Sequence, residues 1–369
     1  MNTFLDFYNE VCTRMEKNIA NWNVAQTRSR NPIIQDGFNR LSRMNCGGKR
    51  LRGALAYLGY CVMSDDGLAV ADALAECFEL FQTAILVHDD IIDHAGSRRG
   101  METIHTAYSR EFMEHHHALQ DDADAMETGC SIALCLGDMG LYLAEERLVE
   151  GYGQHPLLAQ LLSYYHKMVI HTIEGEMLDV QLSYLERCGL REDARYVQTL
   201  PLDTLIYDIY HLKTSCYTTI GPLCSGMLLG GASPALLRQM EQVADDLGVA
   251  FQIQDDILGI YSDAQRLGKN IGSDISEYKQ TLLYSFVKNL GGSAYEQLRQ
   301  YYGKPIITDS ELNAVQGIFR DAGALEAAKG RVAELFASAH NNLSRIKDIP
   351  DEKKNLVHGF IKYLQAREK

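Results

Sequence analysis

The sequence predicts an all-α protein, and three observations support this class. Seven prolines occur in 369 residues, and none lies between Pro32 and Pro156. Residues 68–93 run without glycine or proline, and their apolar side chains recur at spacings of three and four, as on one face of a helix. Neither the period-two alternation typical of strands nor a repeat of about 20–50 residues is present.

The individual elements follow from local signals. The apolar face of the helix at 68–93 is made by Leu74, Cys77, Phe78, Phe81 and Ile85. A second helix begins at "SPALLRQM", with Ser233 as N-cap and Pro234 at the first helical position, and continues through "VAFQIQDDILGIY". We expect a polar loop at 113–127, whose three histidines could alternatively hold a metal, and a turn rather than a phosphate loop at 288–297. No linker separates two halves, so we expect one domain over residues 1–369.

Composition excludes several classes of function. The net charge of −14 disfavours general nucleic-acid binding, and 46% hydrophobic residues indicate a folded chain. No apolar run reaches the roughly 18 residues of a membrane span, and "MNTFLDFYNE" lacks a signal core, so we expect a cytoplasmic protein without a stable membrane anchor. Nine cysteines without a C-x-x-C pair indicate reduced core thiols, with a metal site at Cys130 and Cys135 as the alternative.

The stretch "LVHDDIIDHAGSRRG" (86–100) places three acids at the end of an apolar helix. Asp89 and Asp93 are four residues apart and share a helical face, and Asp90 flanks them. Ionised carboxylates cannot be buried without a counter-charge, so they need solvent, a cation or a metal. A helix end emerging into water would also explain this motif on its own.

A second acidic pair favours a metal site. Asp255 and Asp256 end another apolar helix in "FQIQDDILGIYSD", with Asp263 a little beyond. We expect the two helices to form facing walls of one cavity. Oxygen-only ligands suit Mg²⁺, which retains waters and shares its shell with substrate phosphates.

Basic residues in turns and helix ends fit a phosphate-bearing partner. They are Lys49, Arg50 and Arg52 in "GGKRLRG", Arg98 and Arg99 in "SRRG", Lys213 beside Thr214 in "HLKTSCYT", and Lys269 and Lys279 in "RLGKNIGSDISEYKQT". Each alone reads as a solvated charge. Together with the acids they predict a magnesium–diphosphate site.

These ordered motifs resemble the trans-isoprenyl diphosphate synthases, the polyprenyl synthetase family. The resemblance covers "GGKRLRG", "DDIID" with "RRG", "GDMG" (137–140), "GEMLD" (175–179), "KTSCYT", "GPLCSG", "FQIQDD" and "EYKQTLL", and the ending "FIKYLQAREK". It implies an all-α isoprenoid synthase fold, a helical bundle around a deep central cavity, and a homodimer. It also implies Mg²⁺-dependent head-to-tail condensation of isopentenyl diphosphate with an allylic diphosphate (dimethylallyl, geranyl or farnesyl).

The resemblance also assigns roles to individual residues. It implies that three Mg²⁺ ions bind with the allylic diphosphate, two at Asp89 and Asp93 supported by Asp90 and one at Asp255 near Asp256. It places Arg98, Lys213 and Lys269 on the allylic diphosphate, and Lys49, Arg52, Gln82 and Arg99 on isopentenyl diphosphate. Gln82 stands where many relatives have histidine. The oxygens of Thr214 and Gln252 are expected to face the cationic carbon, and the departing diphosphate to take the final proton.

Two positions depart from the family pattern. Gly259 replaces the last aspartate of the second motif, and Glu176 replaces a common glutamine. A class I terpene cyclase, a non-catalytic synthase subunit and an acidic helical binding protein are the rival interpretations. The cyclase would not need "GGKRLR", and a non-catalytic subunit would have lost its aspartates.

Product length depends on the residues before "DDIID". Ile85 and Phe81 lie one and two turns before Asp89 on its helical face, and relatives that stop at farnesyl length carry an aromatic residue at position 84 or 85. Ala84 and Ile85 provide no such stop, so Phe81 is the next candidate, although it also reads as a core residue. We expect a geranylgeranyl-length product, with geranylfarnesyl, longer or farnesyl products as alternatives.

Overall fold

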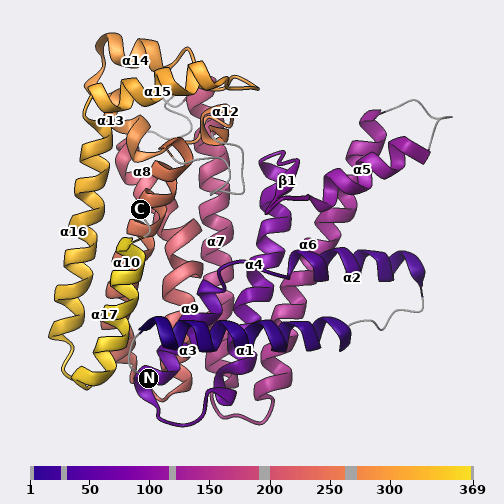
Figure 1. Ribbon diagram of the computed structural model, residues 1–369, viewed down its shortest axis with the longest axis vertical. Helices are drawn as coiled ribbons and strands as arrows, with labels where there is room; N and C mark the ends of the chain where they lie inside the picture. The colour runs from indigo at the N-terminus through magenta and orange to yellow at the C-terminus, as the bar shows by residue number, and fades with distance from the viewer. Residues whose placement is uncertain (1–3, 26–30, 116–121, 191–199, 262–271, 367–369) are drawn as a thin grey trace. The chain divides into compact units, whose positions relative to one another are not determined.

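A computed structural model describes residues 4–25, 31–115, 122–190, 200–261 and 272–366, and these residues are predominantly helical (Figure 1). The predicted all-α class is therefore confirmed. Asp263, Lys269 and most of the histidine run at 115–117 lie outside the described residues, so the predictions made for them remain predictions.

The chain divides into two compact units. The first comprises Met1–Ser163 with Ser225–Ala232, and the second comprises Tyr164–Cys224 with Ser233–Lys369. The boundaries fall within helices α7 (Leu158–Arg187) and α9 (Gly221–Leu229). The expectation of one domain over the whole chain remains a prediction.

The first unit contains helices and one short hairpin. Its further elements are α1 (Phe4–Ala25), α2 (Pro32–Met44), α3 (Leu51–Met63), the 3₁₀ helix η1 (Leu68–Ala71), α4 (Asp72–Ile92), β1 (Ser97–Arg98), β2 (Met101–Glu102), α5 (Ile104–His115) and α6 (Asp122–Tyr152). The helix predicted at 68–93 is confirmed as η1 and α4. The loop predicted at 113–127 is wrong at both ends, since α5 reaches His115 and α6 begins at Asp122. Acids in that first turn favour a helix because they face the positive end of its dipole.

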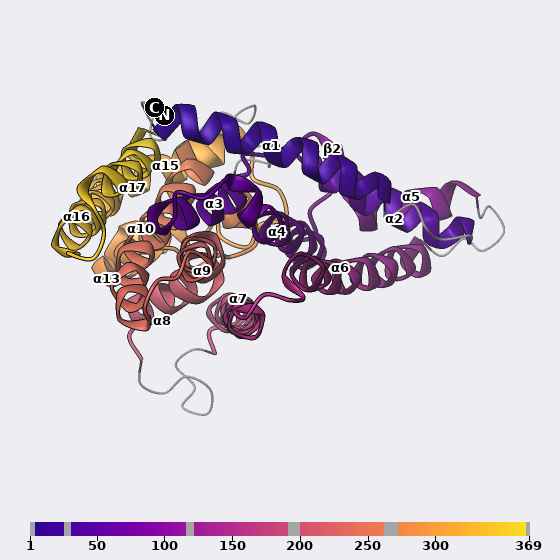
Figure 2. The ribbon, with the colours of Figure 1, turned by 90° about the horizontal axis from the view of Figure 1, so that it is seen from below.

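Helices α4 and α6 pack closely, as Figure 2 shows. Two glycines of "GDMG" permit this contact. A β-carbon at Gly137 would lie 2.2 Å from Nε2 of His88, and one at Gly140 would lie 2.9 Å from the β-carbon of Ala84. This motif therefore fixes the helix that ends in "DDIID".

A hydrophobic cluster joins the helices around this pair. It includes Leu41 of α2, Val87 of α4, Ile104 and Tyr108 of α5, and Leu136 of α6, all buried. Burial of such side chains contributes about 1.5–3 kcal/mol each. The cluster holds α2 and α5 beside the acidic end of α4.

The regular elements among the described residues of the second unit are all helices. Its further elements are α8 (Leu202–Ile209), the π-helix η2 (Tyr210–Ile220), α10 (Pro234–Tyr261), α12 (Ser273–Ser276), α13 (Leu282–Leu290), α14 (Gly292–Leu298), α15 (Asp309–Asp321), α16 (Ala324–Arg345) and α17 (Asp351–Gln365). The helix start predicted at Ser233 is confirmed, because its Oγ accepts the Leu236 amide proton at 3.2 Å. The turn predicted at 288–297 is shorter in the structure, since α13 ends at Leu290 and α14 begins at Gly292. The chain turns at Gly291 and Gly292, whose φ angles are 69° and 65°.

Helix α10 contacts both η2 and α16 in this unit. A β-carbon at Gly248 of α10 would approach Oγ of Ser215 to 2.4 Å, so glycine permits the close contact with η2. Thr219 Oγ1 also donates to the Ala244 carbonyl at 2.7 Å. Wide π turns are rare and often mark functional sites, and this one carries Lys213 and Thr214.

Two properties of the described chain bear on location and metal binding. None of its helices is both long and apolar enough to cross a bilayer. All nine cysteines are unpaired thiols, but only Cys77, Cys216 and Cys224 are buried, so the expectation of core thiols is wrong for the other six. Among the described side chains, no group of three His, Cys, Asp or Glu, and thus none at Cys130 and Cys135, is arranged to hold a metal.

Candidate active site

The acidic end of α4 is paired with an arginine. Arg98 donates through Nε to Asp90 and through Nη2 to Oδ2 of Asp89, the latter at 2.6 Å. Asp90 is buried, and Asp89 and Asp93 are half-buried. Burial opposes the charge of Arg98, but Asp89, Asp90 and Asp93 outweigh it and raise the pKa of the guanidinium. The unit thus places the carboxylates predicted to bind metal beside the guanidinium predicted to bind phosphate.

The β1–β2 hairpin fixes the two arginines of "SRRG". Arg98 pairs with Met101 in register, and Arg99 and Gly100 form the two-residue turn with φ angles of 54° and 75°. Positive φ at both positions is typical of a type I′ turn, which favours glycine at the second. One arginine is therefore held on a strand and the next in a tight turn.

The "GGKRLRG" segment has one structural cation and two predicted ligands. Buried Arg50 pairs with Glu16 at 2.7 Å and Glu79 at 3.3 Å, and these carboxylates raise its pKa against the effect of burial. Lys49 is exposed, and Arg52 is buried in the first turn of α3. Arg50 is therefore engaged in ion pairs within the fold, and the roles of Lys49 and Arg52 as ligands remain predictions.

Arg99 lies against the glycine pair of this segment. Its Nη1 donates to the Gly47 carbonyl at 3.4 Å, and a β-carbon at Gly48, where φ is 93°, would meet its Nη2 at 2.9 Å. Desolvation and the neighbouring charges of Arg50, Arg98 and Arg52 lower the pKa of Arg99, and the charge of Glu79 offsets this only in part. A cluster of cations of this kind favours an anionic ligand.

The predicted chain-length residues differ in their surroundings. Phe81 and Ala84 are fully buried, whereas Ile85 and Gln82 are half-buried. Ala84 faces α6 at Gly140, so a larger side chain at position 84 would press on that helix. Ile85 is therefore the better position for a test of product length.

In the second unit, Lys213 is held by the acids of "GEMLD". Its Nζ contacts Oδ2 of Asp179 at 2.6 Å and Oε2 of Glu176 at 2.9 Å, and Nζ of Lys279 contacts the same Asp179 oxygen at 3.3 Å. A β-carbon at Gly175 would lie 2.3 Å from the Lys213 amide nitrogen, so glycine permits the approach of α7 to η2. Burial favours neutral Asp179, but the two lysines outweigh it and lower its pKa to about 2.

These contacts extend the set predicted from sequence. Asp179 is absent from the predicted residues although it lies in "GEMLD", whereas Lys279 of "EYKQT" was predicted as a cation for a phosphate-bearing partner but was given no individual role. Glu176 stands where the family commonly has glutamine. In this structure its carboxylate forms an ion pair with Lys213 and so helps to position that lysine.

The second acidic pair is linked to Thr214 and Gln252 by hydrogen bonds. Thr214 Oγ1 donates to Oε1 of Gln252 at 2.6 Å, and Nε2 of Gln252 donates to Oδ1 of Asp256 at 2.8 Å. The Tyr210 hydroxyl also donates to Asp256. Burial and the charges of Asp274 and Asp255 raise the pKa of Asp256 well above its usual range. Asp256 is thus buried within a network, while Asp255 is half-buried.

Asp274 lies beside the position where the family motif has its last aspartate. A β-carbon at Gly259 would be 2.8 Å from Oδ2 of Asp274, and the Gly272 amide donates to the Gly259 carbonyl at 3.2 Å. The backbone turn before α12 therefore places the carboxylate of Asp274 next to Gly259, which has no side chain to provide one.

The predicted residues are thus gathered in two groups. The first unit holds Lys49, Arg52, Phe81, Gln82, Ala84, Ile85, Asp89, Asp90, Asp93, Arg98 and Arg99, and the second holds Lys213, Thr214, Gln252, Asp255 and Asp256. That the two groups line one cavity remains a prediction.

Comparison with known proteins gives the class to which this chain belongs. Residues 35–318 match the model of the polyprenyl synthetase family, and the chain belongs to that family. It is therefore a prenyltransferase of the trans-isoprenyl diphosphate synthase class, as the sequence motifs predict.

Individual relatives support this placement. An all-trans-nonaprenyl-diphosphate synthase (geranyl-diphosphate specific) of Rhodobacter capsulatus is 29% identical over 79% of this chain and 77% of its own. A geranylfarnesyl diphosphate synthase of Aeropyrum pernix is 26% identical over 89% and 93%. A crystal structure of geranylgeranyl pyrophosphate synthase from Corynebacterium glutamicum, complexed with isoprenyl diphosphate and magnesium, is 28% identical, with a TM-score of 0.81 over 98% of both chains. The isoprenoid synthase fold is thereby confirmed.

Proposed function

We propose that the protein condenses isopentenyl diphosphate with dimethylallyl, geranyl or farnesyl diphosphate, head to tail and with Mg²⁺, and that its main product is all-trans geranylgeranyl diphosphate. The pairing of Arg98 with Asp89 and Asp90 carries this proposal. It puts metal-binding carboxylates and a diphosphate-binding guanidinium at one helix end, as ionisation of an allylic diphosphate requires.

Arg98 has different partners in the free and substrate-bound states. Without substrate it neutralises Asp89 and Asp90, which lowers the repulsion among the clustered acids. When the allylic diphosphate binds, the guanidinium transfers to its oxygens, and Asp89 and Asp93 become available to the metal. Arginine suits this exchange because its planar fork fits a carboxylate pair and a phosphate group equally well.

The acids present fit Mg²⁺. They are oxygen ligands on two helices, and Mg²⁺ requires only one or two carboxylates when waters and phosphate oxygens complete its octahedron. Asp89, Asp93 and Asp255 would hold it, as three ions with allylic diphosphate bound, while Asp90, Asp256 and Asp274 position them. The ion supplies Lewis-acid stabilisation of the leaving diphosphate. The relative solved with isoprenyl diphosphate and magnesium supports this assignment.

The second unit supplies cations to the leaving group. Lys213 and Lys279 share Asp179, whose low pKa keeps it ionised and keeps both ammonium groups oriented. These lysines, with Lys269, stabilise negative charge on the diphosphate as its bond to the allylic carbon breaks. Thr214 and Gln252 present oxygens to the resulting cation, and their mutual hydrogen bond fixes the direction of those oxygens.

The second substrate is held by other cations. Lys49, Arg52 and Arg99, with the Gln82 amide, bind the diphosphate of isopentenyl diphosphate, whose alkene attacks the allylic cation. The departing diphosphate then removes a proton from the product cation. No side-chain nucleophile is needed, because ionisation provides the electrophile.

Product length is proposed from the helix face before the acids. Ile85 is one turn, about 6 Å, from Asp89, and Phe81 is two turns, about 12 Å. Neither position 84 nor 85 is aromatic, which favours a chain longer than farnesyl. The relatives are named for products from geranylgeranyl to nonaprenyl, so geranylfarnesyl and longer products are the alternatives.

We also propose a homodimer in the cytoplasm. Apolar side chains are exposed in helical rows on α6 and on α7: Met126, Leu134, Tyr142 and Val149 on the first, and Ile170, Ile173, Met177, Val180 and Tyr184 on the second. Exposed apolar rows favour a protein partner.

The direct test is the release of inorganic diphosphate from each allylic primer in the presence of isopentenyl diphosphate. Wild-type enzyme should release inorganic diphosphate only when both substrates and Mg²⁺ are present. Release from the allylic substrate alone would favour the terpene cyclase, and no release from any pair would favour a non-catalytic subunit.

A further inference from the structure

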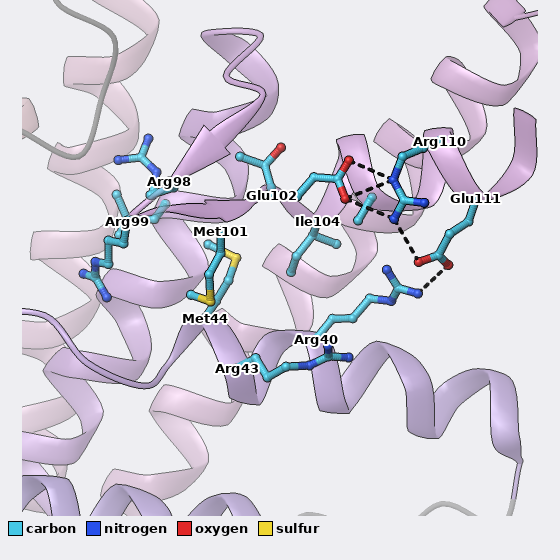
Figure 3. Close-up of a pocket in the computed structure, with 13 residues that line it drawn as sticks. Arg40, Arg43, Met44, Arg98, Arg99, Met101, Glu102, Ile104, Arg110 and Glu111 are labelled. Atoms are coloured by element: carbon cyan, nitrogen blue, oxygen red, sulfur yellow. Dashed lines mark hydrogen bonds and ion pairs between the residues drawn. The ribbon is translucent and has the colours of Figure 1, made fainter. Parts of the chain in front are cut away.

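A cavity of about 350 Å³ lies in the first unit between α2, the β1–β2 hairpin and α5 (Figure 3). Five arginines line it, namely Arg40, Arg43, Arg98, Arg99 and Arg110, against the two acids Glu102 and Glu111. Its apolar lining consists of Met44, Leu86, Met101, Ile104 and Ala107. A cavity of this size accommodates a small ligand.

The arginines are not equally available to a ligand. Arg40 pairs with Asp36 at 2.8 Å and Glu111 at 2.6 Å, and Arg110 pairs with Glu102 at 3.2 Å. Arg98 is engaged by Asp89 and Asp90. In the part of the chain that the structure describes, no carboxylate is ion-paired with Arg43 or Arg99. Their hydrogen bonds to described residues go to backbone carbonyls, from Arg43 to Asn39 at 3.3 Å and from Arg99 to Gly47 at 3.4 Å.

We propose that this cavity is an ancillary site for the diphosphate group of a short isoprenyl diphosphate, which adjoins the two substrate positions, shares Arg98 and Arg99 with them and adds Arg43. Arg43 and Arg99, which form no ion pair among the described residues, favour a ligand with at least two negative charges, and a diphosphate monoester has them. The methionines and Ile104 provide an apolar surface for a short hydrocarbon tail. Inorganic diphosphate shares the head-group chemistry but would not use that surface.

Occupancy of the cavity would regulate the reaction, and this step rests on the proposed function. Arg99 lines the cavity and is also assigned to isopentenyl diphosphate. A ligand that engages Arg99 from the cavity withdraws it from that substrate. Excess isoprenyl diphosphate should therefore inhibit condensation through a residue, Arg43, that has no part in the reaction.

The first experiment is calorimetric binding in EDTA, which removes metal-dependent binding and needs no turnover. Inorganic diphosphate, isopentenyl diphosphate and geranyl diphosphate are titrated into wild type, Arg43→Lys, Arg43→Gln, Arg43→Glu and Arg52→Gln. Arg43 is exposed and has no carboxylate partner to strand, so these variants should fold, which thermal unfolding verifies. Arg52→Gln is the matched control for the isopentenyl diphosphate position.

The proposal predicts two classes of binding site in the wild type. Arg43→Gln should lower the affinity of one class of site about tenfold and leave the affinity of the other class unchanged. Arg43→Lys should have a smaller effect on the first class, and Arg43→Glu a larger one. Arg52→Gln should weaken only the other class. Unchanged binding in all Arg43 variants, or a single class that both substitutions weaken in parallel, would overturn the proposal.

Two further readouts identify the ligand and its effect. Geranyl diphosphate should bind the Arg43-dependent class at least tenfold more tightly than inorganic diphosphate, and equal affinities would overturn the isoprenyl assignment in favour of inorganic diphosphate. In steady-state assays, Arg43→Gln should keep the wild-type rate at low isopentenyl diphosphate and lose inhibition at high concentration. Inhibition that persists in Arg43→Gln would refute the regulatory step, whereas an inactive wild type with intact binding would refute only the proposed function.

Discussion

Replacing Lys213 and Arg52 separately by alanine tests whether the enzyme has two diphosphate positions with different cations. Lys213 lies in the second unit on Asp179 and Glu176, and Arg52 lies in the first turn of α3. We expect Lys213→Ala to raise mainly the Michaelis constant of the allylic substrate. Arg52→Ala should raise mainly that of isopentenyl diphosphate.

The magnitude follows from the partners of each cation. A charge-assisted hydrogen bond is worth about 1.5–3 kcal/mol, or roughly ten- to a hundredfold in affinity. Lys213 must exchange carboxylate partners for phosphate oxygens, so part of its gain is offset, and we expect an effect of about tenfold. Arg52 is buried in a cluster of cations that the ligand relieves, so its effect should reach the upper part of that range, about a hundredfold.

Steady-state kinetics with each substrate varied at saturation of the other will measure these effects. Lys288→Ala is a matched control, because Lys288 pairs with Glu186 of α7 at 2.5 Å but belongs to none of the motifs. It should lower thermal stability and leave both Michaelis constants unchanged. Equal changes in both constants from Lys213→Ala and Arg52→Ala would refute the division into two positions.

Four other predictions follow from the same contacts. Asp89→Ala should keep the fold, since Arg98 retains Asp90, but should lower turnover by orders of magnitude at saturating Mg²⁺; near wild-type turnover would remove the metal assignment. Asp179→Asn should lower the free energy of unfolding by roughly 2 kcal/mol at pH 7, because the folded protein lowers the pKa of this carboxyl from 3.8 to about 2. Because a lowered pKa stabilises only the ionised carboxylate, the difference in unfolding free energy between wild type and variant should be constant above about pH 4. It should vanish as the pH falls through 2. Denaturant unfolding that shows no such loss would contradict the assigned pKa. Ile85→Phe should shorten the main product by one isoprene unit, whose burial is worth about 3–4 kcal/mol, and Phe81→Ala should lengthen the product. An unchanged mass-spectrometric product profile from both variants would show that the prenyl chain does not follow this face of α4. Tyr142→Arg, at a side chain 73% exposed on α6, should convert the proposed dimer to monomer in sedimentation, and an unchanged sedimentation coefficient would exclude this surface.

The motifs could be read from sequence because their signals are local. Asp89, Asp90 and Asp93 lie within five residues, and the spacing to Arg98 implies a turn that returns the arginine to the acids. Likewise, Ser233 and Pro234 are sufficient to place the start of α10. Helix periodicity and capping depend on neighbours in the chain, and the structure confirms them.

Other features depend on contacts between distant segments and could not be predicted in this way. Asp179 meets Lys279 a hundred residues away, and only the fold brings Asp274 beside Gly259. "GDMG" could be recognised in sequence as a family motif, but only the fold shows that Gly137 and Gly140 permit the packing of α6 against α4. The extent of the loop predicted at 113–127 is wrong because a polar acidic segment also suits the first turn of a helix.

The mass of the product formed from isopentenyl diphosphate and geranyl diphosphate, with Mg²⁺, tests prenyl transfer most directly. We expect diphosphate esters that are longer than the primer by whole five-carbon units, with the geranylgeranyl ester most abundant and no such products from Asp89→Ala. A hydrocarbon with the carbon number of the primer, or recovery of both substrates unchanged, would contradict the proposed condensation.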